Sequence, residues 1–146
     1  MKSPIAPLFL LLLCLISLGC GPQRYMTTIS PDKDIDQRLV GVWAGSEEDQ
    51  EYQGLHKSWV MTREADGSFV LDFQVSWNGG PPEQVIKTGR WWIQDGRFHE
   101  YHDSSGATDI YEYEPLSKEQ ILFRASAMAS GNNDYKFIDS RIPSAN

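Results

Sequence analysis

Apolar and polar residues alternate along most of the chain after residue 41, with the period of two that is typical of half-buried β-strands. The alternation is clearest between residues 69 and 77, where the apolar positions are Phe69, Leu71, Phe73, Val75 and Trp77. Eight such segments are rich in aromatic and β-branched residues. We therefore predict strands over residues 42–45, 55–63, 69–77, 84–93, 97–103, 108–114, 120–127 and 134–141.

Turn signals separate these segments at fairly even spacing. Asp66-Gly67 and Asp95-Gly96 are typical of short hairpins, and residues 78–82 and 131–133 are typical of longer turns. Strands joined by short hairpins make an antiparallel meander, which loses its exposed edges when it closes into an up-and-down barrel. The predicted fold is therefore an all-β, eight-stranded antiparallel up-and-down barrel, and a β-sandwich is the alternative.

A short helix is predicted before the first strand. Ser30 is a favourable N-cap, and Pro31 suits the first helical position. Three apolar residues could then share one face of the helix, namely Ile35, Leu39 and Val40. Helix and strands together predict a single domain over residues 30–146.

The first 19 residues have the layout of a secretory signal peptide, in which a basic residue and an apolar stretch precede small residues. The apolar stretch runs from residue 5 to residue 18 and has 14 residues, whereas a membrane-spanning helix needs about 20. Residues 1–19 are therefore predicted to be a signal peptide, and residues 20–29, which show no clear period, a tether.

Ser17, Leu18, Gly19 and Cys20 resemble the lipobox of bacterial lipoproteins, with Ser17 where the box usually carries leucine. The resemblance implies that the thiol of Cys20 carries a diacylglyceryl group and that the new N-terminus carries a further acyl chain such as palmitate. More than one acyl chain gives stable membrane attachment. Gly21 stands where an aspartate would favour the inner membrane, so the resemblance implies a cell-envelope protein, at the outer membrane if the organism has one. A plain secreted protein and an uncleaved membrane helix are the alternatives.

The predicted mature chain is acidic and poor in cysteine. One of the 13 basic residues, Lys2, lies in residues 1–19, which leaves 12 basic and 20 acidic residues and a formal net charge of −8. Because nucleic acid repels such a domain, no nucleic-acid partner is expected. Cys14 leaves with the signal peptide and Cys20 is acylated, so no thiol remains for a disulfide, a thiolate metal site or a nucleophile.

His99 and His102 are three residues apart, a spacing that invites comparison with metal sites. On a strand, however, positions three apart face opposite sides of the sheet, whereas Glu100 and His102 share a face. Two ligands are too few for a closed zinc site, and His56 belongs to a strand that is distant in sequence. The chain also lacks a G-x-S-x-G nucleophile motif and a glycine-rich phosphate loop. We therefore predict no metal, no cofactor and no catalysis.

The segment Gly41-Val42-Trp43, between a short helix and a β-meander, resembles the G-x-W motif of the lipocalin and calycin superfamily. The resemblance covers residues 30–142 and implies that Trp43 closes one end of the barrel. It also implies that Arg141, near the end of the last strand, packs across the Trp43 ring. The predicted barrel is shorter than a typical lipocalin and is more similar to small lipocalin-like bacterial lipoproteins.

An aromatic and apolar face could line a pocket for a small apolar ligand. Its members are Trp59, Met61, Phe69, Leu71, Phe73, Val75 and Trp77. The same residues could equally form a filled core, since eight strands enclose just enough room for side chains or for one small ligand. We expect a lipid-anchored extracytoplasmic protein that binds a small apolar or amphipathic ligand near the membrane. The alternative is a non-catalytic interaction module of the cell envelope with a filled barrel.

Overall fold

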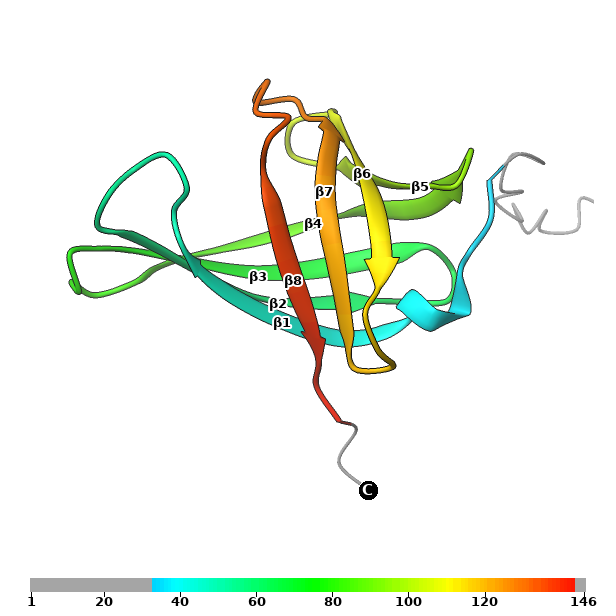
Figure 1. Cartoon of the computed structure of the whole chain (residues 1–146), viewed down its shortest axis with the longest axis horizontal. Coiled ribbons are helices and arrows are strands. Elements are labelled where there is room, and N and C mark those ends of the chain that lie inside the picture. Colours follow the sequence, from blue (N-terminus) through cyan, green and yellow to red (C-terminus); the bar gives the residue numbers. More distant parts are fainter. Residues whose placement is uncertain (1–32, 144–146) are drawn as a thin grey trace, which may run out of the picture.

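The computed structural model describes residues 33–143, which form a closed barrel of eight antiparallel strands in chain order (Figure 1). The strands are β1 (Gly41–Glu48), β2 (Leu55–Arg63), β3 (Ser68–Trp77), β4 (Glu83–Gln94), β5 (Arg97–His102), β6 (Thr108–Pro115), β7 (Gln120–Ala127) and β8 (Lys136–Arg141). β2 and β7 have the predicted bounds, and no other strand end differs by more than three residues. Because β1 pairs with β8, the barrel is confirmed and the sandwich alternative is wrong.

The predicted N-terminal helix is reduced to one 3₁₀ turn over Gln37–Leu39. Its N-cap is Asp36, whose carboxylate accepts a hydrogen bond of 3.0 Å from the Arg38 N–H. Just before this turn, Asp34 and Ile93 of β4 exchange two backbone hydrogen bonds, of 2.8 and 2.7 Å. This long-range pairing holds the chain extended and leaves no room for a longer helix. Ser30 and Pro31, like the signal peptide, Cys20 and the tether, lie outside the described residues.

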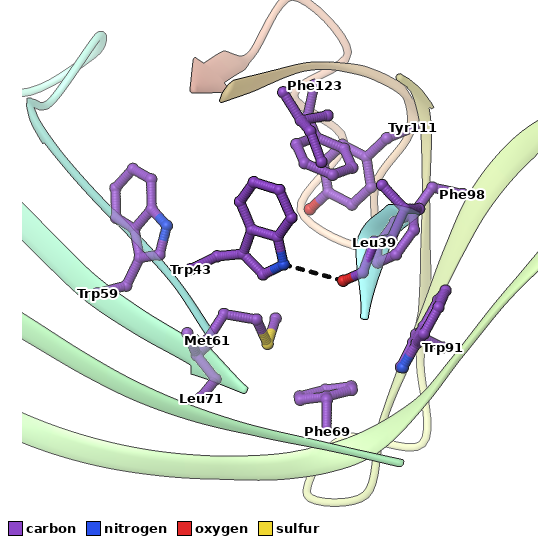
Figure 2. Packing of buried hydrophobic residues seen from close by; sticks show 11 residues of the cluster. Leu39, Trp43, Trp59, Met61, Phe69, Leu71, Trp91, Phe98, Tyr111 and Phe123 are labelled. Atoms are coloured by element: carbon purple, nitrogen blue, oxygen red, sulfur yellow. Dashed lines mark hydrogen bonds between the residues drawn. The ribbon is translucent and has the colours of Figure 1, made fainter. Parts of the chain in front are cut away.

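One end of the barrel is filled with large side chains. Five of them are almost fully buried there, namely Leu39, Trp43, Trp91, Phe98 and Phe123 (Figure 2). The Nε1–H of Trp43 donates a hydrogen bond of 2.9 Å to the backbone oxygen of Leu39, which ties the 3₁₀ turn to the barrel. The 3₁₀ turn and Trp43 therefore close this end, which we call the closed end.

Arg141 on β8 completes the closed end. Its guanidinium lies over the Trp43 ring, 4.1 Å from the ring centroid, so the contact implied by the lipocalin resemblance is present. The same guanidinium donates hydrogen bonds of 2.9 and 2.6 Å to the backbone oxygens of Val40 and Arg38. Gly41 has a φ of +125°, and a Cβ there would overlap the Arg141 guanidinium. The backbone conformation therefore favours glycine two residues before Trp43, and a larger residue there would also displace the Arg141 guanidinium.

The opposite end lies between the β1–β2 loop, residues 49–54, and the β7–β8 loop, residues 128–135. In Figure 1 the β1–β2 and β3–β4 connections project to the left, away from the 3₁₀ turn on the right. Among residues 33–143, no helix is long and apolar enough to cross a membrane.

Candidate functional site

The open half of the barrel lumen contains a cavity of about 360 Å³. Its lining comes from β2, β3, β4, β5, β6 and β8 and from the β1–β2 and β7–β8 loops. Seven apolar side chains form much of the wall, namely Leu55, Trp59, Met61, Leu71, Phe73, Met128 and Phe137. The barrel is therefore filled with side chains at one end and hollow toward the other.

Four of the seven predicted pocket residues line this cavity, namely Trp59, Met61, Leu71 and Phe73. The other three lie elsewhere on the same face of β3. Phe69 is buried in the core of the closed end, Val75 is half-buried, and Trp77 is 55 % exposed beside the Tyr52 ring. The reason is length, since the ten residues of β3 reach from the closed end to beyond the hollow part of the lumen.

Gly45 makes room for the wall residue Trp59. The two residues are paired in the β1–β2 register, and a Cβ on Gly45 would overlap the indole ring of Trp59. Strand β1 accordingly continues through Gly45 to Glu48 instead of ending at the glycine. A small residue in a strand here permits a close approach and does not mark a turn.

A buried ion pair lies below the hollow half of the lumen. Arg63 is 1 % exposed, and its Nη2 donates a hydrogen bond of 2.6 Å to Asp139, which also accepts one of 2.7 Å from the Trp59 Nε1–H. The guanidinium carbon lies 5.0 and 5.1 Å from the ring centroids of Phe98 and Phe123. The remaining nitrogens, Nε and Nη1, have no hydrogen-bond partner among the described residues, so aromatic faces take that place.

A second polar cluster joins β5 and β6. The Nε2 of His102 lies 3.2 Å from an oxygen of Asp109 and 3.3 Å from an oxygen of Glu100. The hydrogen bond with Asp109 raises the pKa of His102, and burial raises the pKa of Glu100. Burial also opposes ionisation of Asp109, but its hydrogen bonds with His102 and the Ala129 N–H hold its pKa below the usual range. The cluster therefore favours a His102–Asp109 ion pair beside a buried carboxyl.

The strand geometry expected for the histidines is confirmed. His102 and Glu100 face the cavity, whereas His99 stacks on the Trp92 ring with 5.2 Å between centroids. His56 lies 3.3 Å from Glu48. Within residues 33–143, no group of three or more histidine, cysteine, aspartate or glutamate side chains is arranged to hold a metal ion.

Two lysines also line the cavity, and their surroundings differ. The ammonium of Lys57 pairs with Asp49 and lies 3.8 Å from Glu47, which also accepts a hydrogen bond of 2.7 Å from the Tyr135 hydroxyl. The ammonium of Lys87 lies 5.2 Å from the centroid of the Phe73 ring, and it makes no ion pair with a carboxylate of residues 33–143.

Sequence reasoning did not single out Arg63, Asp139, Asp109 or either lysine as lumen residues. The strand alternation could have identified some of them, because Arg63 and Lys57 lie an even number of positions from Trp59 and Met61 on β2 and so point to the same face.

No known protein family matches the chain, and no curated protein matches it. The chemistry of the cavity is therefore the basis for a functional hypothesis.

Proposed function

We propose that this protein is a lipid-anchored, extracytoplasmic barrel that binds a small apolar or amphipathic molecule in its lumen, close to a membrane and without catalysis. The observation that carries the proposal is the cavity of about 360 Å³ with seven apolar side chains in its wall. Pockets for small molecules have about 300–1,000 Å³ and combine apolar walls with a few placed polar groups. The hollow half of the lumen favours this hypothesis over an interaction module with a filled barrel.

Apolar contact supplies the expected driving force. Trp59, Met61, Leu71 and Phe73 belong to adjacent strands, and β2–β3 pairing sets Trp59 opposite Phe73 and Met61 opposite Leu71. These side chains therefore form a continuous apolar wall for a ligand. Removing apolar surface from water stabilises a complex by about 25 cal/mol per Å² before the costs of association are subtracted.

Filling the cavity with a larger side chain is expected to abolish ligand uptake. We predict that Leu71→Trp lowers the affinity for the neutral apolar fluorophore N-phenyl-1-naphthylamine by about tenfold or more, because the indole would occupy the space that the probe needs. The measurement is a fluorescence titration of the purified domain, with thermal unfolding followed in parallel because overpacking costs about 1–3 kcal/mol.

Val70→Trp is the matched control for this experiment. Val70 is the neighbouring residue on β3, but its side chain is 48 % exposed on the outer face of the barrel. The same enlargement there is expected to leave probe affinity unchanged. A wild-type domain that takes up no probe, or equal affinities for both variants, would overturn lumen binding.

The anchor is tested separately through Cys20. Without the thiol no diacylglyceryl group can be attached, so we expect Cys20→Ser to move the protein from the membrane fraction to the soluble fraction of cells. The measurement is fractionation followed by immunoblotting, with metabolic labelling by a palmitate analogue. Retention of Cys20→Ser in the membrane fraction would refute the lipobox interpretation and leave the lumen hypothesis intact.

A further inference from the structure

Every carboxylate that lines the cavity already has a partner. Asp49 pairs with Lys57, and Asp139 pairs with Arg63. Glu100 and Asp109 both lie beside the same imidazole nitrogen, Nε2 of His102, and Glu51 accepts a hydrogen bond of 2.8 Å from the neutral side chain of Asn132. Apart from Glu51 in the β1–β2 loop, which no cation of the described residues contacts, the carboxylates of the lining therefore each lie beside a cation.

The cations of the lining are paired in the same way, with one exception. Lys57, Arg63 and His102 each lie beside a carboxylate, whereas Lys87 has only the Phe73 ring near its ammonium within the described part of the chain. Lys87 is half-buried, so its charge is partly removed from water without an opposing charge in contact. The charge of Lys87 acts to lower the pKa of both Asp109 and His102, which are paired with each other.

We propose that the lumen selects amphiphiles whose head group carries a single negative charge, and that the Lys87 ammonium binds this head group. The inference rests on the proposed function, because it names the class of ligand for the same cavity. The ammonium of Lys87, which no carboxylate of the described residues contacts, would be balanced by one anionic group on the ligand.

The position of Lys87 suits such a ligand. Lys87 is opposite Leu71 in the β3–β4 register, and the Phe73 ring lies next to its ammonium. An anionic head at Lys87 therefore places the apolar part of the ligand against Leu71 and Phe73, with Trp59 and Met61 beyond them on β2. Head and tail are both accommodated without breaking any of the ion pairs of the lining.

The test uses three ligands that share a ten-carbon chain and carry an anionic, a neutral and a cationic head group, namely decanoate, decanol and decylamine. Displacement of N-phenyl-1-naphthylamine by each ligand is measured for the wild-type domain, for Lys87→Gln and for Lys136→Gln at neutral pH. We expect decanoate to compete about tenfold better than decanol in the wild type, the size of one charge-assisted hydrogen bond. Lys87→Gln is expected to lose that preference and to keep its affinity for decanol.

Lys136→Gln is the matched control, since it removes an exposed lysine of β8 that does not line the cavity. It is expected to keep the preference for decanoate. Equal competition by all three ligands in the wild type, a preference for decylamine, or a preference that survives in Lys87→Gln would overturn the assignment while lumen binding stands. A wild-type domain that takes up no probe would instead overturn the proposed function, and the ligand class with it.

Discussion

Replacing Asp139 with alanine is expected to destabilise the domain by about 3–5 kcal/mol, the cost of leaving one buried charge without its partner. Arg63 is 1 % exposed, and Asp139 is its only ion-pair partner among the described residues. The variant also removes the acceptor of the Trp59 Nε1–H. The measurement is urea unfolding of the wild type and the variant at 25 °C, followed by tryptophan fluorescence and circular dichroism.

Two further variants distinguish loss of a buried charge from loss of an ion pair as such. The double variant Arg63→Met/Asp139→Leu removes both charges, and we expect it to recover most of the stability, because an apolar pair of similar volume avoids the desolvation cost. Glu114→Ala breaks an exposed pair with Arg124, so its expected cost is below about 1 kcal/mol. An Asp139→Ala variant as stable as Glu114→Ala would contradict the buried-pair interpretation.

The Arg63–Asp139 pair contacts residues of both halves of the barrel. The Arg63 guanidinium lies near the rings of Phe98 and Phe123, which belong to the filled closed end. Its partner Asp139 accepts a hydrogen bond from Trp59, a residue of the cavity wall. Phe137 also connects the two halves, because its ring centroid lies 5.0 Å from that of Phe123 and 5.5 Å from that of Trp59.

The fold could be predicted because its determinants are local. A period of two gives the strands, and the turn residues give their connections, so the pairing order of a meander follows directly. The helix is shorter than predicted because the interaction that competes with it is not local. Asp34 pairs with Ile93, which is far away in the sequence, and that pairing keeps the chain extended up to Asp36.

The site could be predicted only in part, for a similar reason. The alternation assigned Leu71 and Phe73 to the inner face correctly, but it could not say how far along the barrel axis each residue lies. Whether a lumen is filled or hollow depends on side-chain volumes from eight strands together. The alternation places Lys87 on the inner face of β4. Whether a carboxylate of the described residues reaches its ammonium depends, however, on the relative positions of β3, β4, β5 and β6.

Trp43→Ala is expected to destabilise the domain by about 3–5 kcal/mol, the range for removal of a buried aromatic side chain. Trp43 is fully buried, and its loss removes the ring on which the Arg141 guanidinium lies. It also removes the hydrogen bond that ties the Leu39 oxygen of the 3₁₀ turn to the barrel. The variant therefore both leaves a cavity in the closed end and detaches the segment that covers it.

Trp43→Phe separates these two effects, and Trp77→Ala tests their location. The phenylalanine keeps an aromatic ring beneath Arg141 but leaves the Leu39 oxygen without its donor, so a loss of about 1–3 kcal/mol is expected. Trp77 is 55 % exposed near the open end, and its removal is expected to cost much less than that of Trp43. The three variants are compared by chemical unfolding, with circular dichroism as the signal because tryptophans are changed. Equal losses of unfolding free energy for Trp43→Ala and Trp77→Ala would contradict a closing role for Trp43. Trp43 is fully buried beneath the Arg141 guanidinium, whereas Trp77 is exposed.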